Sequence, residues 1–237
     1  MIDKEYVRQE LKPLYEELLE NNNFEHVFPF CIQWGENFPS AKNEGILFVG
    51  KAVNEWDTDE TDVDILFGDS DERIFARDNQ MKWVSTGEGC NGYNSNRSAF
   101  WRVNRKITQK FYPKDEWYSY VAWSNLYKLN QGGNPKASLC KEQFDSCKTI
   151  LEKEIEIFSP KFVVMLTSGW ERGFLTFLNG NHEPEIELTK NWGHVTNLHR
   201  INGVAYVATP HPQGKKEGPH VEAITELINN ILDKGKA

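Results

Sequence analysis

Polar residues suited to hydrogen-bonding and proton-transfer chemistry follow several short apolar runs of the chain. His211 lies between Pro210 and Pro212, and these prolines restrict the backbone around it and favour a fixed imidazole. Asn125 follows the run 120–123, and its amide can donate and accept together, as reading the edge of a planar heterocycle requires. An imidazole that donates to an oxygen can stabilise negative charge on a departing group. A His and an Asn in one site would suit cleavage of a bond to a heterocyclic leaving group.

Both residues also have a structural interpretation. His211 could make its loop rigid through a satisfied hydrogen bond. Asn125 could stabilise the turn that follows a strand. The residue types alone leave both interpretations open.

Strand-like and helix-like segments alternate along the chain and must position these residues. Apolar runs predict strands at 45–50, 118–126 and 162–166, and Asn202-Gly203 predicts a hairpin between 195–201 and 204–208. Helical spacing predicts helices at 7–19 with an interruption at Pro13, at 100–111, at 144–158, at 167–178 with Gly180 as its αL terminator, and from Pro219 onward. This order predicts one α/β domain over residues 1–237, with three layers and a mostly parallel central sheet.

Ligands of open α/β sheets bind at the carboxyl ends of the strands, so the residues just after each predicted strand are the candidates for binding. Four segments qualify, namely 50–56, 124–128, 167–170 and 209–214. We therefore expect their loops to converge on one cleft. The predicted substrate-binding residues are Gly50, Lys51, Ala52, Trp56, Trp101, Asn125, Ser168, Pro212 and Gln213.

Aromatic and basic residues near these segments could hold the rest of a nucleotide. Trp56, Phe100 and Trp101 are candidates for stacking on an extruded base; Phe100 lies on the inner stripe of its helix, as a core residue would, whereas Trp101 lies off that stripe. The predicted phosphate-binding residues are Arg97, Arg102, Lys128, Lys215 and Lys216. The basic stretch 97–110 could equally be the solvated outer face of a helix.

The order of the four segments resembles the uracil-DNA glycosylase superfamily. The resemblance involves 46–54, 121–125, 160–166 and 207–214, about a sixth of the chain, and the His-Pro element is its most specific part. In that superfamily the first strand ends in a glycine and a water-activating loop, the second in a base-reading Asn, and a late strand carries the His-Pro motif. The resemblance implies a uracil-DNA glycosylase-like fold, with Asn125 reading a base and His211 stabilising it as it leaves.

The first loop departs from the pattern of that superfamily. The chain has Gly50-Lys51-Ala52-Val53, without the following proline and with Ala52 where the superfamily places Asp or Asn. Asn54, Glu55 or Asp57 would then have to activate the water. Some members carry an iron-sulfur cluster, but the spacing of the four cysteines here does not fit one.

Composition excludes several function classes. The net charge of −8 argues against a protein that coats nucleic acid through general electrostatics. Apolar runs such as 162–166 are far shorter than the roughly 20 residues that span a bilayer, and the first residues do not resemble a secretory signal. We expect no membrane partner, a cytoplasmic location, no cofactor and no metal, with Cys31, Cys90, Cys140 and Cys147 as reduced core thiols. The acidic segment 55–72 is interpreted as a solvated loop. The oligomeric state stays open.

The leading hypothesis is a glycosylase-like hydrolase that cleaves the N-glycosidic bond of a nucleobase in DNA or in a nucleotide. Two alternatives remain. Ala52 at the activator position suggests a catalytically inactive binding protein of the same fold. The acidic net charge suggests a hydrolase of a small nucleotide-like metabolite.

Overall fold

The computed structural model describes residues 2–39, 44–56, 59, 61–70, 74–89 and 92–234. The helices in these ranges are α1 Lys4–Glu20, α2 Val63–Leu66, α3 Trp83–Thr86, α4 Ala99–Thr108, α5 Ala137–Glu142, α6 Phe144–Phe158, α7 Arg172–Leu178 and α8 Glu217–Lys234, with 3-10 turns at Ser95–Arg97 and Trp117–Tyr120. The strands are β1 Phe28–Pro29, β2 Gln33–Trp34, β3 Ile46–Gly50, β4 Val121–Asn125, β5 Leu129–Asn130, β6 Phe162–Leu166, β7 Leu188–Asn191, β8 Val195–Ile201 and β9 Val204–Thr209.

One seven-stranded sheet forms the centre of the described chain, in the order β2-β4-β3-β6-β9-β8-β7. Strands β4, β3, β6 and β9 are parallel, while the pairs β2-β4, β9-β8 and β8-β7 are antiparallel. The expected parallel sheet is therefore correct for the four central strands. Strands β7, β8 and β9 are antiparallel because the short connections between them, such as the Asn202-Gly203 turn, can join only antiparallel neighbours.

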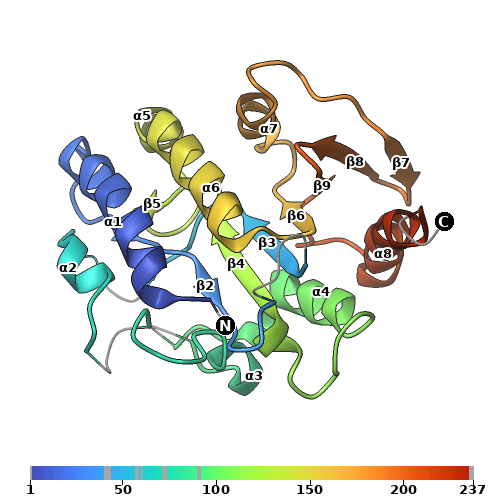
Figure 1. Ribbon diagram of the computed structural model, residues 1–237, viewed down its shortest axis with the longest axis horizontal. Helices are drawn as coiled ribbons and strands as arrows, with labels where there is room; N and C mark the ends of the chain where they lie inside the picture. The colour runs from blue at the N-terminus through green and yellow to red at the C-terminus, as the bar shows by residue number, and fades with distance from the viewer. Residues whose placement is uncertain are drawn as a thin grey trace.

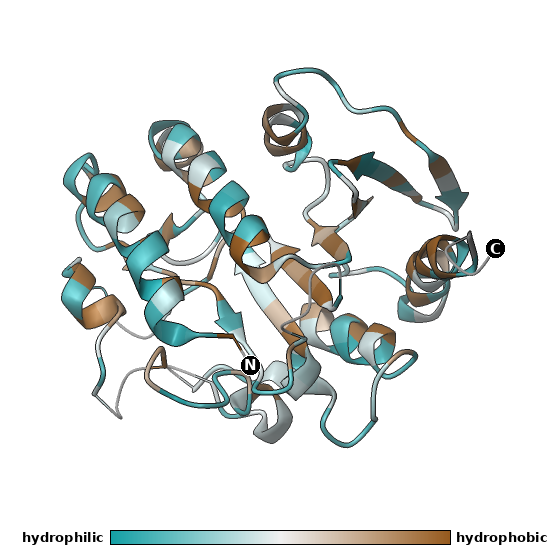
Figure 2. Cartoon of the chain, viewed as in Figure 1, coloured by the Kyte–Doolittle hydropathy of each residue, from teal (hydrophilic) through white to brown (hydrophobic). Residues whose placement is uncertain are grey.

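Helices cover both faces of this sheet, so the architecture is α/β with three layers. Along β3, Leu47 and Val49 join the core cluster under α1, α6 and α7, whereas Ile46 and Phe48 join the cluster under α4 and α8. Figure 1 shows α1 beside α6 and α4 beside α8. Figure 2 shows apolar residues on the sheet and polar ones on the outer helix surfaces. Burial on both faces explains the continuous apolar runs of the central strands.

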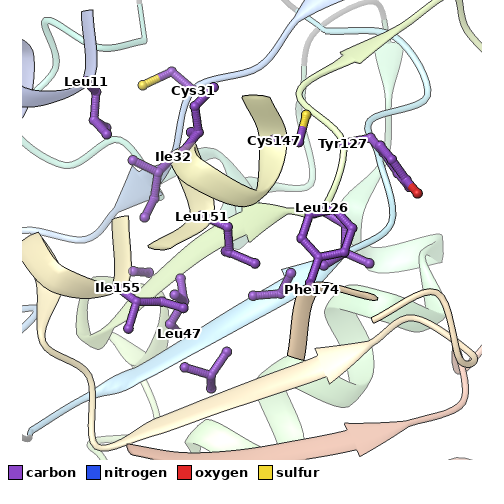
Figure 3. Close-up of a cluster of buried hydrophobic side chains, with 14 of the residues drawn as sticks. Leu11, Cys31, Ile32, Leu47, Leu126, Tyr127, Cys147, Leu151, Ile155 and Phe174 are labelled. Atoms are coloured by element: carbon purple, nitrogen blue, oxygen red, sulfur yellow. The ribbon is translucent and has the colours of Figure 1, made fainter. Parts of the chain in front are cut away.

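Side chains from distant segments fill the first core cluster. Figure 3 shows Leu151 and Ile155 of α6 above Leu47 of β3, with Cys147 near Tyr127. Cys31, Cys140 and Cys147 are buried free thiols, and burial raises the pKa of Cys147 to about 12. Cys90 lies outside the described residues.

The structure corrects several predicted boundaries. Helix α1 runs through Pro13 without interruption, because Val7, Leu11 and Tyr15 pack both halves into the same core. Helix α8 begins two residues before Pro219; the proline stands in the first turn, where a missing N–H costs nothing. Residues 118–120 form a 3-10 turn that precedes β4 instead of the start of the strand.

Within the described ranges, no helix has the length and apolar character needed to cross a membrane. The same residues contain no group of three or more His, Cys, Asp and Glu side chains placed to hold a metal ion.

Two helical glycines provide a matched test of the packing. A Cβ on Gly173 would lie 2.6 Å from Phe144 Cζ, whereas a Cβ on Gly218 meets nothing within 4 Å. We expect Gly173→Ala to lower the free energy of unfolding by about 1–3 kcal/mol through overpacking. Gly218→Ala should raise it by up to about 1 kcal/mol, because alanine favours the helix. Urea unfolding measures both changes, and equal effects of the two substitutions would contradict this packing.

Candidate functional site

A cleft of about 900 Å³ opens at the carboxyl ends of β3, β4 and β9. Its lining consists of 50–56, Trp83, 92–94, 97–102, Trp123, Asn125, 133–135, His211, Gln213 and Gly214. Gly50, Asn54, Asn125 and His211, which come from three of the four segments expected to converge, line the cleft. Ser168 does not line it but holds the His211 loop, as described below.

Asn125 is fixed at the end of β4, directly beside Gly50. The parallel register pairs Gly50 with Asn125, and the Asn125 side-chain oxygen occupies the space that a Cβ on Gly50 would need. Asn125 is only 2% exposed, and its amide nitrogen has no partner among the described residues. An unpaired buried donor costs free energy, which a ligand acceptor in the cleft would recover.

Two hydrogen bonds hold the His211 loop, one made by the backbone of His211 and one by its ring. The backbone N–H of His211 donates to Ser168 Oγ at 2.7 Å, and Ser168 itself has a left-handed backbone with φ of 59°. The N–H of Gln213 donates to His211 Nδ1 at 3.4 Å. This bond requires an unprotonated Nδ1, so the proton of the neutral ring is on Nε2.

The imidazole of His211 is uncharged near neutral pH. Burial lowers its pKa to about 4, and the positive charges of Lys51 and Lys215 add to this shift. The ring stacks on Phe100 with centroids 6.3 Å apart and planes inclined by 17°. His211 is therefore a neutral, oriented N–H donor.

Aromatic rings form the apolar part of the cleft. Trp123 lies at the centre and contacts the rings of Trp56, Trp83 and Trp101, mostly edge to face, at centroid distances of 5.2, 6.0 and 4.9 Å. Trp101 was expected to lie outside the buried stripe of its helix, but it is 3% exposed, because α4 also packs against Trp83. Phe100, expected in the core, is both buried and in contact with His211. The residues predicted to stack on a base therefore belong to one fixed aromatic cluster.

The loop after β3 supplies the candidate water-activating groups. Asn54 and Glu55 are exposed lining residues, and Asn54 Oδ1 accepts the N–H of Gly133 at 2.7 Å. The side-chain oxygen of Asn54 is therefore used to hold the lining segment 133–135. Ala52 lines the cleft without a polar atom, and Asp57 lies outside the described residues.

The predicted phosphate-binding residues have different environments. Arg97 is exposed and lines the cleft, whereas Lys215 and Lys216 do not line it. Pro212, which was predicted to bind substrate, is buried and does not line the cleft either. Arg102 also lines the cleft, but it pairs with Glu217 at 2.7 Å, so its charge is partly neutralised.

Lys128 was predicted to bind phosphate, and this prediction is wrong. Its side chain is completely buried and its Nζ lies 2.8 Å from a carboxylate oxygen of Glu154. The chain turns inward after β4, and α6 supplies the charge that the buried ammonium requires.

Sequence reasoning missed Trp83 and Trp123 as lining residues. Trp123 lies two residues before Asn125 on β4, so its side chain points to the same face; that period-two pattern could have indicated it. Trp83 comes from a region of short elements, and no sequence signal places it in the cleft.

A second buried histidine supports the end of β9. The His220 Nε2 and Thr209 Oγ1 atoms are 2.8 Å apart, and Thr209 Oγ1 lies 2.8 Å from Thr196 Oγ1. Trp192 donates to Thr196 and stacks on His220 at 4.4 Å. Because a Trp N–H can only donate, Thr196 Oγ1 accepts from Trp192, while the threonine hydroxyls can donate or accept in the other two contacts.

Gly50→Ala should move the Asn125 side chain out of its present position, because the new methyl group would overlap the side-chain oxygen. We expect a loss of ligand affinity of roughly 10-fold or more, similar to that of Asn125→Ala, with cooperative unfolding retained. Tryptophan fluorescence titration with a free base or nucleoside measures affinity. Gly218→Ala, which adds a methyl group outside the cleft lining where nothing lies within 4 Å, is the control. Unchanged affinity in Gly50→Ala would contradict the assigned close approach.

Buried His220 and half-buried His211 should make stability depend on pH. Burial lowers the pKa of His220 to about 4, as for His211, from an ordinary value of 6.5. As the pH falls, these histidines are protonated in the unfolded chain before they are protonated in the folded one. Their contribution to the free energy of unfolding is therefore fully present above about pH 6.5 and is lost as the pH drops towards 4. We expect His220→Asn to remove roughly half of this slope. Urea unfolding across that range measures it, with exposed His26→Asn as control; an undiminished slope in His220→Asn would refute the assignment.

Comparison with protein-family models and with curated proteins gave no match. The chemistry of the cleft is therefore the basis for assigning a function.

Proposed function

We propose that this chain is a glycosylase-like hydrolase that cleaves the N-glycosidic bond of a nucleobase in DNA or in a nucleotide. The observation that carries the proposal is that an unpartnered Asn125 amide and a neutral His211 N–H donor line one aromatic cleft. Both occupy the strand ends at which the resemblance to the uracil-DNA glycosylase superfamily would place them. We infer a uracil-DNA glycosylase-like fold on the same grounds.

In this reaction Asn125 binds the base and His211 stabilises it as it leaves. Asn125 donates its amide N–H to an oxygen of the base, which recovers the cost of burying an unpaired donor. As the bond between C1′ and the base nitrogen breaks, its electron pair moves to the base, and His211 Nε2–H donates to the base oxygen that becomes negative. The aromatic cluster around Trp123 holds the base away from water.

Water completes the reaction at C1′. Glu55 is the one carboxylate among the described residues that line the cleft, and it would accept the proton as the water oxygen bonds to C1′. Asn54 is less suited to this step, because its oxygen already accepts the Gly133 N–H.

A binding protein without catalysis is the second candidate, and Ala52 is the observation that favours it. A methyl group can neither orient nor deprotonate water at the position where the superfamily has a polar side chain. Such a protein would keep the Asn125 contact and the aromatic cluster while leaving the substrate intact.

The test is single-turnover incubation with single-stranded and double-stranded DNA containing one uracil, followed by hot alkali to cleave abasic sites. We expect strand cleavage, and His211→Ala should lower its rate by roughly 100-fold or more with binding nearly unchanged, because His211 acts on charge present only in the transition state. Exposed His194→Ala is the matched control. Full activity in His211→Ala would remove its catalytic role, and binding without cleavage by the wild-type chain would favour the second candidate.

A further inference from the structure

A fully buried ion pair lies directly behind the cleft. Lys128, three residues after β4, and Glu154 of α6 are both 0% exposed, and Lys128 Nζ lies 2.8 Å from each oxygen of Glu154. Burial raises the pKa of Glu154, and the adjacent ammonium opposes that rise. A buried ion pair is often no more stabilising than apolar residues of the same size, so stability alone does not account for it.

The remaining hydrogen bonds of the Lys128 ammonium go to the last two residues of β4. Its Nζ donates to the carbonyl oxygen of Asn125 at 2.8 Å and contacts Ser124 Oγ at 2.6 Å. Ser124 Oγ in turn donates to Glu154 at 2.6 Å. The ammonium therefore joins the backbone of the cleft asparagine to helix α6.

Lys128 supports β4 on the side where β2 no longer pairs with it. Strand β2 pairs with β4 only at Ala122 and Trp123 among the described residues, so the pairing on that side ends before Asn125. Lys128 is itself fixed, because Gln143 accepts its backbone N–H at 3.0 Å and its carbonyl accepts from Phe30 at 2.8 Å. An anchored cation can thus hold the strand end on the side opposite β3, where no strand pairs with Asn125 among the described residues.

We propose that Lys128, held by Glu154, is a positioning residue that fixes the Asn125 amide over Gly50 for ligand recognition. The effect on activity rests on the proposed function, whereas the effect on the Asn125 side chain does not. The carbonyl of Asn125 and its side chain share one Cα, so holding the carbonyl restricts the direction of the amide. The pair acts from the protein interior and does not touch the ligand.

The test replaces the whole pair, because removing one partner would leave an uncompensated buried charge. The first readout is the side-chain amide NMR signal of Asn125, assigned by its loss in Asn125→Ala. In Lys128→Met/Glu154→Leu we expect this signal to shift and broaden. Lys153→Met/Glu156→Leu removes a partly exposed ion pair of the same helix and should leave the Asn125 signal unchanged. Ser124→Ala keeps the ion pair and should give a smaller shift, which provides a result even if the double variant does not fold.

The second readout is a mutant cycle in single-turnover rate on uracil DNA. We expect Lys128→Met/Glu154→Leu to lower the rate roughly 10-fold to 100-fold, but to have less than about a 2-fold effect when Asn125 is already alanine. An equal loss in both backgrounds would overturn the proposal, as would an unmoved amide signal in the folded double variant or in Ser124→Ala. If the wild-type chain cleaves no DNA, the proposed function fails, and the amide signal still decides whether Lys128 positions Asn125.

Discussion

The parallel register between β3 and β4 is the constraint on which the cleft depends. It places Gly50 beside Asn125, so a residue without a Cβ adjoins the one side chain that needs the space. A slip of one residue would turn Asn125 to the opposite face of the sheet. The buried runs of both strands prevent such a slip, because each face packs against a different helical layer. The core therefore determines the direction of a polar side chain that contributes nothing to the core itself.

The charges around the cleft are divided between two tasks. Lys51 and Lys215 act with burial to keep His211 neutral, which leaves its Nε2–H available as a donor over the physiological range. Arg102 and Lys106 both bind Glu217 and so join α4 to α8. Two cations of the basic stretch 97–110 are thus used in ion pairs between helices, while Arg97 stays exposed at the edge of the cleft. This division explains how a chain of net charge −8 can present local positive charge at one opening.

Periodicity predicted the central fold well, because buried parallel strands and their covering helices leave strong local patterns. The run 162–166, the helix over 144–158 and the Asn202-Gly203 turn all lie where those patterns placed them. The same patterns could not place Trp83 or reveal the partner of Lys128, since both depend on contacts between segments distant in sequence. Lys128 resembled an exposed cation because its neighbour Glu154 is 26 residues away. Strand ends predicted which loops meet, whereas burial decided which of their side chains face the cleft.

The position of Ala52 distinguishes binding from catalysis in this cleft. Asn125 and His211 are held by separate networks, one through Lys128 and α6 and the other through Ser168 and Gln213. Each network would remain intact in a protein that only binds, because neither includes the side chain of Asn54 or Glu55. Catalysis additionally requires an acceptor for the proton of water, and Asn54 is occupied by Gly133. Under the proposed function, and among the residues that the structure describes, the difference between an enzyme and a binding protein therefore reduces to whether the exposed carboxylate of Glu55 can reach water at C1′.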